Sequence, residues 1–155
     1  MHKHLQICIV LLLLVRITTA QNTSSQIDRL VTLADAEPNL EGKIKFLLLA
    51  ESRSADCLPC KAQCHAQLGL LYCEAGHYEA GYNHLLVAIN LRRQLGDSLR
   101  VAGNFANMAM FKQEEGQYAQ AIEYATNSLL ILESIQQQLH LEESLDLVCF
   151  IFNGF

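Results

Sequence analysis

Apolar residues recur along the chain at the three- and four-residue spacing that is typical of amphipathic helices. The first such stretch, around Ile27 and Val31, predicts a short helix that stops near Pro38. A second helix is expected from Leu40 to about Ser54. Because no apolar–polar alternation reaches five residues and the chain has only 2 prolines, the pattern predicts an all-α protein.

A sequence motif returns after 40 residues. The pattern L-G-x-x-Y-x-x-x-G-x-Y-x-x-G at residues 68–81 is followed by M-A-x-x-K-x-x-x-G-x-Y-x-x-A at residues 108–121, and V-C-x-x-F at residues 148–152 opens a third copy. Periods of this length are typical of stacked helical units, which build extended binding surfaces. We therefore expect a partner-binding protein and no enzymatic activity.

Each copy has the pattern of two helices joined by a tight turn. Gly76 and Gly116 stand where the first helix of each copy should end with a positive φ angle. Between the copies, Gly96 can end one helix, and Asp97 or Ser98 can cap the start of the next. Such short links place consecutive helices antiparallel, so the predicted fold is a solenoid of antiparallel helix hairpins.

The pattern divides the chain into parts of different character. Residues 1–20 form a leader, residues 21–59 a degenerate entry pair of helices, residues 60–97 and 98–137 the two clear repeats, and residues 138–155 the first helix of an incomplete third repeat. This last helix is largely apolar, whereas terminal repeats normally have a polar outer face. Three interpretations stay open: the chain is a fragment of a longer protein, its end was altered by a change of reading frame, or the helix docks on a partner or another copy.

The leader has the layout of a secretory signal peptide. Lys3 precedes an apolar run at residues 7–15, and Thr-Thr-Ala at residues 18–20 precedes a polar stretch that begins at Gln21. The run is shorter than the roughly 20 residues that span a bilayer, although an uncleaved anchor is an alternative interpretation. We expect a periplasmic or secreted protein that has no membrane segment after cleavage.

Charge argues against nucleic acid as a partner. The chain has 11 basic and 16 acidic residues, and because Lys3 and Arg16 belong to the leader, 9 basic residues remain after cleavage and the net charge is −7. Binding to nucleic acid requires a basic surface. The expected partner is therefore a protein or peptide.

The two repeats resemble tetratricopeptide repeats at the motif positions quoted above. Leu85 and Ala88 continue the match in the first repeat, and Leu-Gly-Asp at residues 95–97 is similar to the link of a subclass with a lengthened second helix. The resemblance implies a right-handed solenoid. With the leader, the chain is similar to the exported N-terminal sensor region of bacterial membrane-bound histidine kinases and transcriptional regulators, so a truncated sensor domain without autonomous activity is the alternative function.

In the family that the chain resembles, the first helices of the repeats line a concave face that binds peptides. Carried over by position, the acidic residues at the edge of this face would surround an apolar centre and suit an amphipathic helix or an extended peptide with a few cations. The face implied by the resemblance consists of Gln63, Ala66, Leu70, Cys73 and Glu74 from the first repeat, and Gly103, Ala106, Met110, Gln113 and Glu114 from the second.

Ligand-type side chains gather in C-L-P-C-K-A-Q-C-H at residues 57–65. Cys57 and Cys60 have the spacing of a redox dithiol, but no βαβ pattern supports a thioredoxin-like site. A local disulfide between them after export is an alternative interpretation that stays open. The repeat pattern places His65 between helices as a core residue. A haem or metal carrier built on this segment is a minor alternative, and we predict no cofactor and no metal. Isolated histidines such as His84 are assigned to helix surfaces or turns, with no catalytic role.

Overall fold

The structure is a computed structural model that describes residues 23–153, with side chains placed through residue 139. The predicted leader at residues 1–20 lies outside the described residues. Within them the protein is helical and has no strand, which confirms the predicted all-α class. The chain divides into two compact units between Leu91 and Arg92, and each unit is described by itself.

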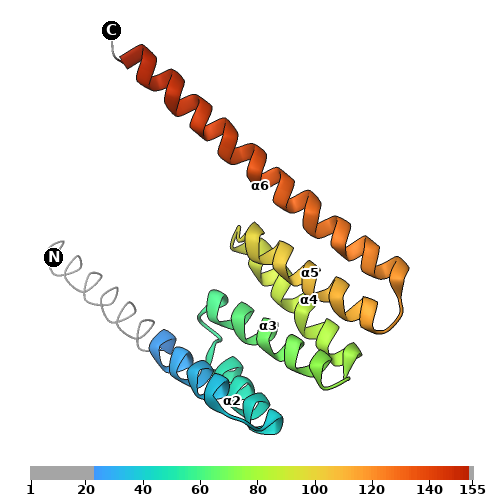
Figure 1. The fold of residues 1–155 in the computed structure, drawn as a ribbon. Coiled ribbons are helices and arrows are strands. Elements are labelled where there is room, and N and C mark those ends of the chain that lie inside the picture. The colour runs from blue at the N-terminus through green and yellow to red at the C-terminus, as the bar shows by residue number, and fades with distance from the viewer. Residues whose placement is uncertain (1–22, 154–155) are drawn as a thin grey trace, which may run out of the picture. The chain divides into compact units, whose positions relative to one another are not determined.

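The helices follow one another through short links. A helix at residues 23–36 is followed by α2 (Leu40–Arg53), α3 (Leu58–Glu74), α4 (Tyr78–Gln94), α5 (Ser98–Glu114) and α6 (Tyr118–Asn153) (Figure 1). The predicted stop before Pro38 and the predicted end of the next helix near Ser54 are both confirmed. In the part of the chain that the structure describes, no helix combines the length and the hydropathy needed to cross a bilayer.

Local chemistry sets the ends of these helices. Gly76, Gly96 and Gly116 follow α3, α4 and α5 with φ angles of 80°, 70° and 74°, as predicted. Glycine suits these positions because a Cβ atom disfavours positive φ. The carboxylate of Asp97 accepts a hydrogen bond from the backbone N–H of Arg100 and so caps α5. Each glycine therefore allows the chain to turn into the next helix.

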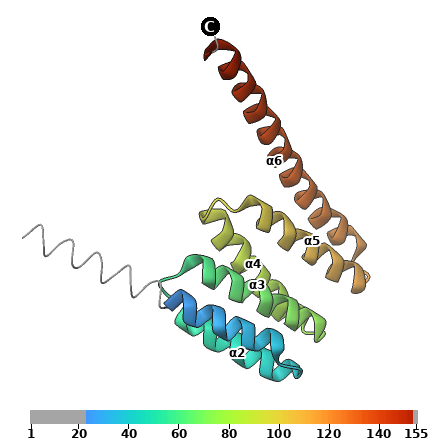
Figure 2. The same cartoon turned by 60° about the vertical axis from the view of Figure 1, so that its left-hand side comes forward.

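In the first unit, the helix at residues 23–36, α2 and α3 pack around a shared apolar core (Figure 2). Ile27, Leu47 and Leu68 in this core are at most 2 % exposed. The next helix, α4, approaches α3 closely where Gly69 and Gly81 face each other. A Cβ atom on Gly69 would lie 2.9 Å from the carbonyl oxygen of Gly81. The absence of side chains at both positions permits this contact.

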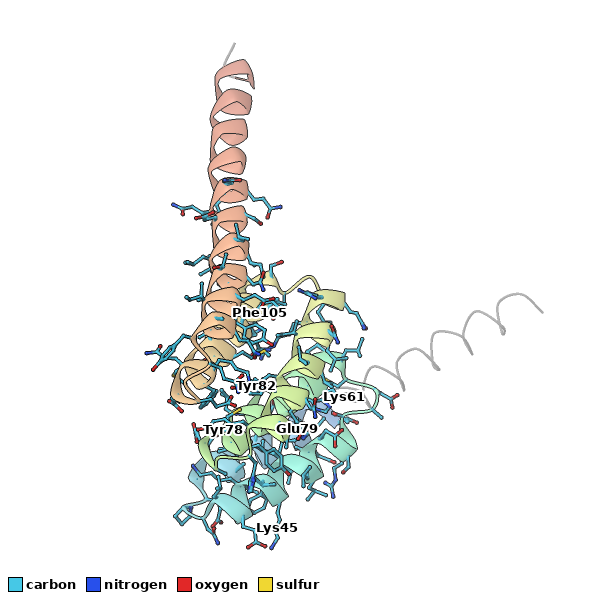
Figure 3. All side chains as sticks on the ribbon, turned by 90° about the vertical axis from the view of Figure 1, so that its right-hand side faces the viewer. Lys45, Lys61, Tyr78, Glu79, Tyr82 and Phe105 are labelled. Carbon is cyan, nitrogen blue, oxygen red and sulfur yellow. A yellow bond between two sulfur atoms is a disulfide. The ribbon has the colours of Figure 1, made fainter. Side chains whose placement is uncertain are left out.

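In the second unit, α5 packs against α6, and Phe105 lies at the centre of their contact (Figure 3). Its ring is stacked on that of Tyr124 with the centroids 6.1 Å apart, and the guanidinium of Arg93 lies 5.6 Å from its centroid. The guanidinium of Arg92 donates a 2.7 Å hydrogen bond to the side-chain oxygen of Asn104. The last turn of α4 is therefore held against α5 by a cation–π contact and a charge-assisted hydrogen bond.

The helix break expected near Gln137, between the second and third repeats, is wrong. Instead, α6 runs from Tyr118 to Asn153 without interruption. Gln136 occupies the position that Gly96 holds one repeat earlier, so the glycine that ends α4 has no counterpart here. Glutamine favours a helix, which explains why the chain continues past the expected turn.

Candidate partner-binding groove

An open groove of about 640 Å³ lies on the second unit between α5 and α6. Large apolar side chains border it with much of their surface in solvent: Tyr118 is 66 % exposed, Ile122 67 % and Leu129 59 %. Single exposed apolar residues are ordinary, but a contiguous patch marks an interaction surface. The groove is lined by Ala106, Ala109, Met110, Gln113, Tyr118, Ala121, Ile122, Ala125, Ser128, Leu129 and Leu132.

The periodicity of α6 produces one wall of this groove. Tyr118, Ile122, Ala125, Leu129 and Leu132 follow one another at intervals of three or four residues, so they form one stripe along the helix. Four of the lining residues are alanines, and their small side chains leave room for the hollow. Because no charged residue lines the groove, removal of apolar surface from water would supply most of the free energy of binding.

The predicted face of the second repeat is only partly in this groove. Ala106, Met110 and Gln113 line it, as part of the α5 wall. Gly103 and Glu114 are exposed on α5 but do not line it. The predicted acidic rim is therefore not part of the groove.

Sequence reasoning missed the wall that α6 contributes. The family resemblance assigns the binding face to the first helix of each repeat, and α6 begins as the second helix of its repeat. The available signal was the apolar stripe from Tyr118 to Leu132. An apolar stripe of that spacing either packs against another helix or remains exposed as a binding surface.

The predicted face of the first repeat requires a correction. Ala66 and Cys73 are 6 % and 1 % exposed, so they do not line an open surface. Cys73 is buried because it lies where α4 approaches α3 most closely. Gln63 is exposed on α3, and Leu70 and Glu74 line a separate cavity of about 250 Å³ in the first unit.

This smaller cavity has polar groups from three helices. Asp35, Lys43 and Gln67 line it together with apolar side chains. The side-chain oxygen of Gln67 is buried and has no hydrogen-bond partner among the described residues. A buried acceptor without a donor costs free energy, so we expect a bound water molecule to satisfy it.

His65 is buried at 8 % exposure, which confirms its predicted place in the core. The expectation that His84 is isolated is wrong, because the Nδ1 atoms of the two rings lie 2.9 Å apart. His84 also stacks on Tyr72, and the Nε2 atom of His65 lies 3.6 Å from a carboxylate oxygen of Glu51. Sequence could not reveal this pair because its members are nineteen residues apart on different helices.

The histidine pair makes the stability of the first unit depend on pH. Burial lowers the pKa of both rings, and for His65 the neighbouring His84 and Lys61 lower it further, while Glu51 opposes the shift for both. Below the ordinary value of 6.5 the unfolded chain therefore binds more protons than the folded chain, and folding weakens as pH falls.

We expect the thermal unfolding midpoint to be lower at pH 5 than at pH 7.5. This decrease should be smaller for His84→Phe than for the unchanged chain. Only one of the two Nδ1 atoms can carry a proton in their hydrogen bond, so double protonation removes a bond worth about 1 kcal/mol, or several degrees in the midpoint. Phenylalanine keeps an aromatic ring against Tyr72 but cannot titrate. Differential scanning calorimetry at the two pH values measures the effect, and equal falls for both chains would contradict the assignment.

The cysteine segment has no open metal-binding geometry. Cys57 and Cys60 are joined by a disulfide at the start of α3, which removes both sulfurs as thiolate ligands. Burial, and then the charge of Glu51, raise the pKa of the Cys64 thiol to about 11, so it stays protonated at neutral pH. Over residues 23–139, no three His, Cys, Asp or Glu side chains are grouped to hold a metal ion. With both sulfurs in the disulfide, the segment lacks the two thiolates on which the metal-carrier alternative depends.

Comparison with known proteins assigns no family to the chain. None of the models of known protein families matches it, and no curated protein matches it either. The resemblance to tetratricopeptide repeats therefore depends on the motif residues of this chain alone.

Proposed function

We propose that this chain is an exported module that binds a protein or peptide, and that the groove between α5 and α6 takes the apolar face of an amphipathic helix. The observation that carries the proposal is the exposed, contiguous apolar lining of this groove. Helices recognised in this way insert side chains spaced at i, i+4 and i+7 into a hydrophobic groove.

The proposed architecture is a right-handed solenoid of tetratricopeptide-like hairpins. Its support is the 40-residue repeat, the glycines with positive φ that end α3, α4 and α5, and the close packing of α5 on α6. The leader at residues 1–20 supports export to the periplasm or beyond. Nothing in the groove suggests catalysis, because its lining contains no carboxylate, histidine or cysteine.

A peptide with the sequence of α5, residues 98–114, is a suitable probe. It presents Val101, Phe105 and Met108 at i, i+4 and i+7, the spacing that the groove should recognise. We expect saturable binding to the full chain, measured by surface plasmon resonance with the chain immobilised sparsely so that neighbouring molecules do not meet.

The substitution Leu129→Glu should weaken this binding at least about tenfold, which corresponds to roughly 1.4 kcal/mol. Leu129 is 59 % exposed, so the variant should keep its fold, yet a carboxylate in the groove would lose its hydration when the peptide binds. The matched control is Leu48→Glu on α2, a position that is 40 % exposed and outside the groove. Equal affinity in both variants would refute the groove as the binding site.

A further inference from the structure

The groove has the composition of a surface that is packed elsewhere in the same chain. Counting back 40 residues, seven of its eleven lining positions fall on buried residues of the first unit. The contrast is greatest for Leu129, which is 59 % exposed, and its equivalent Ile89, which is 1 % exposed. Ala125 likewise corresponds to Leu85, which is fully buried. The groove therefore corresponds to a face that is buried in the first repeat and exposed in the second.

The chain contains a segment with the pattern needed to cover this face. In α5, the buried positions Val101, Phe105, Met108 and Phe111 form the stripe that faces the protein interior. Forty residues later the same positions are occupied by Leu141, Leu145, Val148 and Ile151, all of them large and apolar. Residues 138–153 thus repeat the buried stripe of α5 in the second half of α6.

A chain with this structure cannot place that segment in its own groove. Residues 138–153 continue the axis of α6 (Figure 1). The residues of α6 that line the groove all lie between Tyr118 and Leu132, in the first half of the same helix. α6 has 36 residues and α5 has 17, so α5 can accompany α6 over only about half its length of roughly 54 Å. To fold back, the helix would need a turn at Gln136, where the chain lacks the glycine that it has at the equivalent position 96.

We propose that a second copy of the chain fills the groove, with residues 138–153 of each copy lying antiparallel to α6 of the other. This proposal rests on the proposed function, because it names the occupant of the same groove. It is a domain swap. At the position where a turn would return residues 138–153 to their own chain, α6 continues straight, so these residues make the corresponding contact with the second copy instead.

The pairing register within the second unit supports a symmetric exchange. Arg92 contacts Asn104, and Arg93 contacts Phe105, where the end of α4 meets α5. Moving both pairs forward by 40 residues places residue 132 beside residue 144 of the second copy, and residue 133 beside residue 145. The midpoints of the two pairs are residues 138 and 139. A two-fold axis that passes near Gln138 would therefore place the segment of each copy in the groove of the other, as a closed dimer requires.

The direct test is to restore the missing turn. Gln136→Gly together with Gln137→Asp recreates the Gly96-Asp97 link that ends α4 and caps α5. We expect light scattering after size exclusion to give a dimer for the unchanged full chain, and half that mass for the double variant with its helical circular dichroism retained. The matched control, Gln136→Ala with Gln137→Ala, should remain a dimer because alanine continues the helix.

A second pair of measurements separates this inference from the proposed function. Leu129→Glu should also reduce the mass to that of a monomer. An excess of the α5 peptide should dissociate the dimer, because the peptide and residues 138–153 of the second copy compete for the same groove. A dimer that is unchanged by Leu129→Glu and by the restored turn would overturn the swap. A monomeric full chain that captures the α5 peptide would overturn the swap and leave the proposed function standing, and a monomer that captures no peptide would overturn both.

Discussion

Replacing Gly69 with alanine should destabilise the first unit by about 2 kcal/mol. The new Cβ atom would lie 2.7 Å from the Cγ atom of Leu85 and 2.9 Å from the carbonyl oxygen of Gly81. Leu85 is fully buried, and the carbonyl belongs to the backbone, so neither neighbour can move without shifting α4. This overpacking, which costs up to about 3 kcal/mol, exceeds the gain of about 1 kcal/mol in helix propensity.

Gly103→Ala on α5 is the matched control and should have the opposite effect. Gly103 is an exposed glycine within a helix, and a Cβ atom there would meet nothing within 4 Å. Only the helix propensity changes, so we expect stabilisation of about 0.5–1 kcal/mol. Urea denaturation followed by circular dichroism measures both variants, and a Gly69→Ala chain as stable as the unchanged protein would contradict the close contact between α3 and α4.

Phe105→Ala should have a larger effect, a loss of about 3–5 kcal/mol in the stability of the second unit. Phe105 is 7 % exposed, and its ring contacts Tyr124 of α6 and the guanidinium of Arg93 in the last turn of α4. Truncation would leave a cavity at the junction of three helices and remove both ring contacts. Because the surrounding helices cannot close fully over the cavity, most of this cost should remain.

The control for Phe105→Ala is Leu99→Ala on the same helix. Leu99 is 64 % exposed and lies outside the groove, so its truncation should change stability by less than about 0.5 kcal/mol. Hydrogen exchange in α5 and α6 reports the two effects locally. Similar exchange in the two variants would mean that Phe105 does not hold these helices together.

The sequence predicted the helices well wherever local chemistry sets their ends. Gly76, Gly96 and Gly116 could be read as helix stops because positive φ is a property of the residue itself. The continuous α6 was missed because the repeat pattern was extended through Gln136, although glutamine provides no reason to stop. In a repeat protein the period predicts equivalent positions, while the residue at each link decides whether the chain turns there.

The candidate site was harder to predict because it depends on which helix covers which. Ala66 and Ala106 are equivalent by sequence, yet one is buried and the other lines an open groove. The same holds for Leu129 and Ile89, whose environments differ although their positions in the repeat agree. Burial at a repeated position depends on what packs against it, which the local pattern does not contain.

The groove itself is tested by hydrogen–deuterium exchange of the full chain, diluted until light scattering shows a monomer, with and without the α5 peptide. If the groove between α5 and α6 receives a helix, exchange should slow at residues 106–113 and 118–132, which contain its lining, and Leu129→Glu should abolish the slowing. Exchange that is unchanged at these residues, or that slows only in the first unit, would contradict the assignment of the groove as the binding site.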